Sequence, residues 1–340
     1  MSKILLNNAR ISGIVCAVPD NKRTIAEVGE KYFDRAFIER IGNTVGTNTL
    51  YFTKENQSSG DLGIAAAKKL MEELDWEAES VGALIFNSQT ADFVIPPTSV
   101  RIQHALGLST DTFVADTNYG CMAFPIGLMM AYQMIALGQC GRIILIDAEC
   151  HHKAVSRSDA DTALFFGDAA AATAIEESPG APRAAFKTFV DGEHVSEIFL
   201  KSFKDIPNEK NTLDDRVYMN GEAVTRYMFR QIPKFAADLL ASCGCEMDDI
   251  DAVLMHQANA YMLKFLGKRM HIDPAKVLIN IGHYGNTSSV SIPLLLVDEL
   301  PGLFAGGRKK LMMIGFGAGF MIAGAIMEAG DLKGGQVIFV

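Results

Sequence analysis

Two long segments of this 340-residue chain carry no charged side chain, and the fold has to keep both away from water. The segments are Thr117–Gly141 and Leu311–Met327, and their lengths approach that of a membrane-spanning helix. However, the first contains Pro125, Gln133 and Gln139, the second contains four glycines, and neither is flanked by an asymmetric set of Lys and Arg residues. We therefore expect both segments to be buried inside protein, without membrane contact.

The composition indicates a packed globular protein. Hydrophobic residues make up 49% of the chain and charged residues 21%, which is too apolar for a disordered chain. The formal net charge of −9 argues against a general nucleic-acid binder, which needs a basic surface. The N-terminal residues include neither a long apolar region nor a cleavage site of small residues. We therefore expect no export signal and a cytoplasmic location.

Short apolar runs alternate with segments of helical periodicity, which predicts an α/β fold with mixed sheets. The expected strands are Gly82–Phe86, Thr112–Ala115, Arg142–Ile146, Ala252–Met255, Val277–Ile281 and Leu311–Ile314. The expected helices are Leu62–Leu74, a long apolar helix that begins near Cys121, Glu222–Ser242, Asn259–Met270 and Ser288–Leu300.

The chain also shows a weak internal similarity. Phe166–Asp168 is followed by small residues and then by Ala174–Glu176, much as Phe316–Ala318 is followed by small residues and then by Ala325–Glu328. The turn-forming stretch Ser178–Pro182 separates the two regions. We therefore predict two similar halves, residues 1–177 and residues 178–340.

The cysteines and histidines do not predict a metal site. The six cysteines follow no disulfide framework. Cys243 and Cys245 are separated by only one residue, with no neighbouring Cys or His cluster, so we interpret this pair as the end of a helix. His151 and His152 are adjacent, and on an extended segment adjacent side chains point to opposite faces, so they cannot easily share one ion.

Three residues with catalytic chemistry lie where a predicted strand meets a predicted helix. Cys121 opens the uncharged helix, where backbone N–H groups favour a thiolate, so it is a candidate nucleophile. His256 ends an apolar strand, the place where α/β sheets carry their sites. Asn286 follows a glycine-containing loop. The structural alternatives are a buried cysteine, a core histidine and a helix-capping asparagine.

Together the three residues favour acyl transfer through a cysteine. A thiolate can accept an acyl group, while an imidazole and an amide can donate hydrogen bonds to a developing oxyanion. Papain-like proteases carry Cys, His and Asn in the same order, but the signature around their nucleophile is absent from this chain. The residues alone indicate acyl transfer and specify no particular reaction.

Five sequence blocks make the chain resemble the β-ketoacyl-ACP synthase III family of the thiolase superfamily. They occur in the order and at the approximate separations found in that family: Asn118–Phe124, Phe166–Asp168, Met255–Asn259, Tyr284–Ser288 and Gly315–Gly319. The resemblance covers the chain from about residue 80 to the C-terminus. It implies a five-layered α-β-α-β-α body built from two duplicated halves, usually a homodimer.

The resemblance also implies a mechanism. Cys121 accepts the acyl group of a coenzyme A or carrier-protein thioester, and His256 and Asn286 hold the carbonyl of a malonyl thioester during loss of carbon dioxide. The resulting enolate then attacks the acyl-cysteine in a Claisen condensation, as in fatty-acid or related secondary-metabolite biosynthesis. The backbone N–H groups of Cys121 and Ala318 form an oxyanion hole. Such an enzyme uses no metal and no cofactor, and its partners are thioester substrates and acyl carrier protein.

Departures from the family pattern affect the substrate more than the chemistry. The N-terminal tryptophan and the Thr-Gly-Ile-Arg-like run of the family are missing, and Tyr261 stands where an arginine is common. Three basic residues are candidates for docking an acidic carrier protein, with a solvated charged face as the alternative: Lys264, Lys268 and Arg269. Ile95 stands where the family often extends an aromatic residue toward the partner's acyl pocket.

Three alternative functions remain open. The altered N-terminal block is compatible with an acyltransferase of the same fold that acylates an amine or alcohol without decarboxylation. The chain would otherwise be a partner subunit in a heteromeric synthase, although the complete set of three residues argues against this. A papain-like hydrolase is the most distant alternative.

Overall fold

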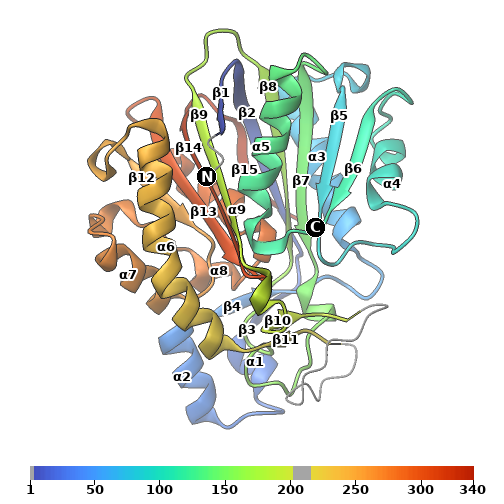
Figure 1. Cartoon of the computed structure of the whole chain (residues 1–340). Coiled ribbons are helices and arrows are strands. Elements are labelled where there is room, and N and C mark those ends of the chain that lie inside the picture. Colours follow the sequence, from blue (N-terminus) through green and yellow to red (C-terminus); the bar gives the residue numbers. More distant parts are fainter. Residues whose placement is uncertain (1–3, 202–215) are drawn as a thin grey trace.

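Two mixed β-sheets, separated by central helices and covered by further helices on their outer faces, form the body of the protein (Figure 1). This computed structural model describes residues 4–201 and 216–340. Residues 1–3, which contributed to the expectation about export, lie outside the described residues. From one side to the other the layers are helix, sheet, helix, sheet and helix, which confirms the predicted α-β-α-β-α architecture.

The first sheet has six strands in the order β15-β2-β8-β7-β5-β6. They are β2 (Ala9–Val18), β5 (Ala83–Asn87), β6 (Phe113–Thr117), β7 (Arg142–Glu149), β8 (Ala169–Glu177) and β15 (Lys333–Phe339). Its outer face is covered by α3 (Ser59–Leu74) and α4 (Thr98–Ala105). Because this sheet is packed on both faces, its central strands are buried along almost their whole length, as their unbroken apolar sequences predict.

The second sheet has five strands in the order β1-β9-β14-β13-β12. They are β1 (Ile4–Leu6), β9 (Ala184–Val190), β12 (Ala252–Met255), β13 (Lys309–Gly317) and β14 (Met321–Ala329). Helices α6 (Gly221–Cys243) and α7 (Ala260–Arg269) cover its outer face.

The two uncharged segments occupy the interior, as expected. The central layer consists of α5 (Ala123–Ala136) and α9 (Ser291–Leu303), which pack between the sheets in the largest hydrophobic cluster. No residue of α5 before its last is exposed, so the helix needs no polar face. The second uncharged segment forms most of the β13–β14 hairpin. Among the described residues, no helix is both long and apolar enough to cross a membrane.

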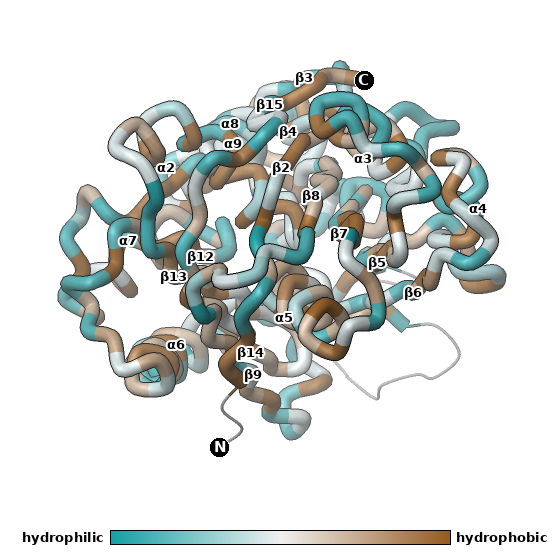
Figure 2. Tube along the Cα trace, turned by 90° about the horizontal axis from the view of Figure 1, so that it is seen from above, coloured by the Kyte–Doolittle hydropathy of each residue, from teal (hydrophilic) through white to brown (hydrophobic). Residues whose placement is uncertain are grey.

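Shorter elements gather at one end of the body, below the sheets in Figure 1. They include two small strand pairs, β3 (Lys22–Thr24) with β4 (Thr49–Tyr51) and β10 (Ile198–Phe199) with β11 (Tyr218–Met219). The short α-helices here are α1 (Ile25–Gly29), α2 (Arg35–Val45) and α8 (Ile281–Tyr284). Seen from above, apolar segments concentrate toward the middle of the molecule and polar ones toward its rim (Figure 2).

Local sequence signals set several helix boundaries. Ser58 and Asp61 form a capping box that starts α3, and the side chain of Asn259 accepts a hydrogen bond from the backbone N–H of Met262 at the start of α7. Gly244, with a φ of 69°, ends α6. The interpretation of Cys243 and Cys245 as a helix end is therefore confirmed.

One expected strand is wrong. In the predicted strand Val277–Ile281, only Val277 makes a bridge, to Val253 of β12, and Ile281 already begins α8. The backbone N–H of Asn280 donates to the side chain of Gln257 at 3.0 Å. This side-chain contact takes the place of a strand partner, so the β ladder does not continue beyond one residue.

The two predicted halves exchange their terminal strands. The boundary after residue 177 coincides with the end of β8, the last strand of the first sheet before the chain enters the second. However, β1 pairs with β9 in the second sheet, and β15 pairs with β2 in the first. Each sheet therefore contains one strand from the other half of the chain, and these strand pairs connect the two halves.

The close packing of α5 on the first sheet leads to a stability prediction. A Cβ atom on Gly127 of α5 would lie 2.5 Å from a methyl carbon of Leu145, a fully buried side chain of β7. Gly302 of α9 has open space around its Cα. We expect Gly127→Ala to lower the free energy of unfolding by about 1–3 kcal/mol through overpacking. Gly302→Ala, which only improves helix propensity, should raise it by about 0.5–1 kcal/mol. Urea unfolding measures both, and equal stabilities of the two variants would contradict the packing argument.

Candidate active site

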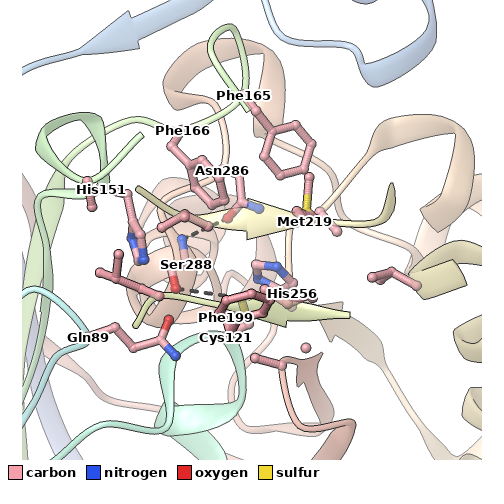
Figure 3. A pocket seen from close by; sticks show the side chains of 18 of the residues that line it. Gln89, Cys121, His151, Phe165, Phe166, Phe199, Met219, His256, Asn286 and Ser288 are labelled. Atoms are coloured by element: carbon pink, nitrogen blue, oxygen red, sulfur yellow. Dashed lines mark hydrogen bonds between the residues drawn. The ribbon is translucent and has the colours of Figure 1, made fainter. Parts of the chain in front are cut away.

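A cavity of about 1310 Å³ opens where the ends of the two sheets meet. Its lining includes Cys121, His256 and Asn286, which lie far apart in the sequence. The structure thus brings together the three residues selected from the sequence. Figure 3 shows their side chains gathered around Ser288.

Cys121 lies in a 3-10 turn, η2 (Gly120–Met122), between β6 and α5. Gly120 adopts a φ of 59°, which lets the chain reverse there. The end of β13 packs directly against this turn: a Cβ on Gly315 would lie 2.6 Å from the Cys121 carbonyl oxygen, and one on Gly317 would lie 3.3 Å from Sγ. Gly315 and Gly317 therefore let the second sheet pack closely against Cys121.

Burial, with a smaller contribution from Glu149, raises the pKa of the Cys121 thiol to about 12, while a contact of 3.5 Å with Ser288 Oγ acts in the opposite direction. Burial therefore opposes the thiolate that the helix start is expected to favour.

His256 is placed by its own strand. It follows β12, and its backbone N–H donates to the carbonyl of Ile314 in β13 at 2.9 Å. Its ring contacts Phe316 edge-on at 5.3 Å between centroids. Burial lowers the pKa of His256 to about 3, so the imidazole is neutral at physiological pH.

A serine hydroxyl contacts one ring nitrogen of His256. Ser291 Oγ lies 2.8 Å from His256 Nδ1 and 2.9 Å from the carbonyl oxygen of Ser288. When this hydroxyl donates to the Ser288 carbonyl, it accepts from Nδ1–H, and Nε2 is left as a proton acceptor. When it donates to Nδ1, the proton resides on Nε2, which becomes a donor. Ser291 thus accommodates both neutral tautomers.

Asn286 is held by the Phe166–Asp168 block. Its backbone N–H donates to Phe165 at 2.9 Å, and its carbonyl accepts from Gly167 at 3.1 Å. A Cβ on Gly167 would lie 2.2 Å from the carbonyl oxygen of Tyr284, so these segments approach each other at a glycine. The side-chain oxygen of Asn286 accepts from the Ser288 backbone N–H at 2.8 Å. Its amide nitrogen makes no hydrogen bond to a described residue, so it can donate to a ligand.

The remaining predicted residues lie at the border of the cavity or outside it. Ala318, the other member of the expected oxyanion hole, lines the cavity next to Gly317. The basic residues are exposed on α7, whose first turn reaches the cavity through Met262: Lys264, Lys268 and Arg269. Ile95 is 85% exposed and does not line the cavity of its own chain, although its neighbours Phe93 and Val94 do.

Sequence reasoning missed four polar residues of the site. Ser288 lies in the block Tyr284–Ser288 that identified the asparagine, and Ser291 follows three positions later. His151 and Gln89 also line the cavity. The adjacent histidines at 151 and 152 drew attention only as metal ligands, and nothing in the local sequence distinguishes Gln89.

The raised pKa of Cys121 predicts a pH dependence. Because only the thiolate reacts, the rate of alkylation of Cys121 by iodoacetamide should rise about tenfold per pH unit between pH 7 and pH 9. Ser288→Ala should slow the reaction at each pH, since it removes the contact that lowers this pKa. Peptide mass spectrometry separates Cys121 from the half-buried cysteines Cys140, Cys243 and Cys245. A rate that levels off below pH 8 would show a stabilised thiolate instead.

Comparisons with known proteins agree with the fold. The family model described as "3-Oxoacyl-[acyl-carrier-protein (ACP)] synthase III" matches residues 115–192, which include Cys121, and the model of its C-terminal part matches residues 240–329, which include His256 and Asn286.

Individual relatives extend the similarity over most of the chain. The beta-ketoacyl-[acyl-carrier-protein] synthase III of Lactococcus lactis subsp. cremoris (strain MG1363) is 33% identical over 282 residues, covering 81% of this chain and 86% of the relative. The synthase III of Clostridium perfringens is 27% identical and covers 95% of this chain and 100% of the relative. A crystal structure of a 3-oxoacyl-(acyl-carrier protein) synthase from Burkholderia xenovorans LB400 superimposes with a TM-score of 0.96 at 32% identity, covering 100% of this chain and 99% of that structure. The chain therefore belongs to the 3-oxoacyl-[acyl-carrier-protein] synthase III family.

Proposed function

We propose that the protein catalyses a decarboxylative Claisen condensation between an acyl group carried on Cys121 and a malonyl thioester, as a step in fatty-acid or related secondary-metabolite biosynthesis. The observation that supports this most strongly is the convergence of Cys121, His256 and Asn286 on one cavity. The family relationship makes condensation more plausible than hydrolysis or another acyl transfer.

In the first step, Cys121 takes the acyl group from a thioester. Nε2 of neutral His256 accepts the thiol proton, and the sulfur forms a new C–S bond as the old one breaks. The departing thiolate then takes the proton from His256 and leaves as a free thiol. The high pKa of Cys121 makes this acceptor necessary.

In the second step, the malonyl thioester loses carbon dioxide. The electron pair of the broken C–C bond moves into an enolate, whose oxygen accepts hydrogen bonds from Nε2–H of His256 and from the amide of Asn286. Both donors lie in a buried site, where such bonds stabilise developing charge most strongly. The enolate carbon attacks the acyl-cysteine, a new C–C bond forms, and the C–S bond to Cys121 breaks. The thiolate then takes a proton from solvent, which the raised pKa of Cys121 favours.

The proposal includes partners and location. The exposed basic residues of α7, near the cavity border, would dock an acidic acyl carrier protein: Lys264, Lys268 and Arg269. A homodimer would cover the exposed apolar residues Phe93, Val94 and Ile95, which fits the expected role of Ile95 in the partner's pocket. The reaction needs no metal or cofactor, and we assign the enzyme to the cytoplasm.

The function can be tested by separating the two steps. Wild-type protein should gain the mass of an acyl group when incubated with acyl thioesters and should release carbon dioxide from malonyl thioesters. Cys121→Ala should abolish acylation. Asn286→Ala should keep acylation but slow decarboxylation about 10²–10³-fold, because it removes one donor to the enolate oxygen. Intact-protein mass spectrometry and ¹⁴CO₂ release provide the measurements. Acylation of wild-type protein without release of carbon dioxide would instead indicate transfer to an amine or alcohol.

The role of Ser291 gives a separate prediction. Ser291→Ala leaves His256 Nδ1 without its hydrogen-bond partner, so we expect decarboxylation to slow by about tenfold or more while the melting temperature changes little. Ser12→Ala is the matched control, because Ser12 is also buried and donates to a backbone carbonyl, that of Ala174, but lies in β2 outside the cavity lining. Equal activities of the two variants would show that Ser291 does not position His256.

A further inference from the structure

His151 is a polar side chain in the cavity wall that the proposed mechanism does not use. It follows β7 in a 3-10 turn, η3 (His151–Lys153), and is only 5% exposed. Its ring stacks on Phe166, with 4.9 Å between centroids. Neither ring nitrogen makes a hydrogen bond to a described residue, and Nδ1 is fully buried. A buried imidazole without a partner costs about 1–3 kcal/mol, so the site requires an explanation.

Burial favours the neutral form of the His151 ring. Burial lowers the pKa of His151 to about 4, although the charge of Asp168 acts in the opposite direction. The nearest carboxyl oxygen, Glu149 Oε2, lies 3.6 Å from Nδ1, too far for a hydrogen bond. A neutral imidazole offers one N–H donor and one lone pair. His151 is also close enough to His256 to lower the pKa of that catalytic residue.

A second polar side chain, that of Gln89, lies on the same side of the cavity as His151. Gln89 is held by its backbone N–H, which donates to the same oxygen of Glu149 at 3.1 Å. Its side-chain amide makes no hydrogen bond to a described residue and lies against Gly120, where a Cβ would approach Gln89 Oε1 to 2.4 Å. The amide thus lies next to the turn that carries Cys121. The exposed side chain of Gln89 and the buried side chain of His151 thus both line the cavity that contains Cys121.

The cavity is chemically two-sided. Figure 3 shows His151 and Gln89 on one side of Ser288 and Cys121, with Phe165 and Met219 on the opposite side. An unsubstituted alkyl chain would find suitable contacts only on the apolar side, and it would leave the buried imidazole of His151 without a partner, whereas Gln89 is exposed. A hydroxyl group, which both donates and accepts, matches the imidazole and the amide.

We propose that the acyl group transferred to Cys121 carries a hydroxyl group close to its thioester carbon, and that His151, together with Gln89, binds this hydroxyl. The substrate class is a short hydroxyacyl thioester. This inference rests on the proposed acylation of Cys121 and adds the chemical character of the acyl group.

Paired substrates of equal chain length test the inference. Wild-type protein is incubated with butyryl thioesters and with both enantiomers of 3-hydroxybutyryl thioesters, each on coenzyme A and on acyl carrier protein. Acylation rates at Cys121 are followed by intact-protein mass spectrometry. We expect one hydroxylated enantiomer to react about tenfold faster than butyryl, because a site built to bind a hydroxyl discriminates against the analogue that lacks it.

Variants of His151 connect this preference to the side chain. His151→Leu should abolish the preference while butyryl still acylates Cys121, which also shows that the variant is folded. His151→Gln should restore part of it, since an amide can donate and accept. His104→Leu, at an exposed position in α4 that does not line the cavity, is the matched control and should leave the preference unchanged.

The outcomes separate this inference from the proposed function. Equal rates for butyryl and 3-hydroxybutyryl thioesters in wild-type protein, or a preference that survives in His151→Leu, would overturn the hydroxyl site while leaving the condensing function intact. Failure of every thioester to acylate Cys121, together with no carbon dioxide release from malonyl thioesters, would overturn the proposed function itself.

Discussion

The site depends on backbone contacts between the two sheets that only glycine permits. At Gly315 any side chain would lie 2.6 Å from the carbonyl oxygen of Cys121, and at Gly167 it would lie 2.2 Å from the carbonyl oxygen of Tyr284. In the first contact, β13 of the second sheet packs against the turn of the first sheet's half that carries Cys121. The second brings the segment before β8 against the loop that carries Asn286. The cavity therefore exists only when both sheets are docked on the central helices, and the exchanged terminal strands β1 and β15 reinforce this docking.

Burial gives the centre its chemical character. It moves the pKa of Cys121 up to about 12 and that of His256 down to about 3, so both residues are neutral before substrate binds. A site of neutral donors and acceptors avoids the cost of holding an isolated buried charge. In the proposed reaction, charge develops only after substrate binds, and the amide of Asn286 and a proton on His256 stabilise it. Ser291 accommodates both tautomers of His256, which the proposal requires because His256 accepts a proton in one step and donates a hydrogen bond in the next.

The fold was predictable where the sequence signal is local. The strand Ala252–Met255 has the predicted bounds, because a short apolar run between polar residues can only be buried as a strand here. His256 could be selected because it ends that strand, and Asn286 because glycine precedes it. Val277–Ile281 is also mostly apolar but does not form a strand. The side chain of Gln257, more than twenty positions earlier in the chain, binds the backbone N–H of Asn280 instead. For Cys121 the helix start is visible in the sequence, whereas the burial that raises the pKa of its thiol is not.

By itself, the sequence indicated a mixed α/β fold with an uncharged interior and singled out Cys121, His256 and Asn286 as candidates, while the resemblance to a known family implied the five layers. The α/β pattern and the candidates follow from patterns in which each residue acts on its near neighbours: apolar periodicity, glycines at turns, and reactive side chains at the ends of strands. The tertiary structure decided which strands the termini join, how Ser288 and Ser291 contact Cys121 and His256, and how His151 and Gln89 come to face the cavity. Those features arise when segments distant in sequence pack together and exclude water, and no local pattern contains that information.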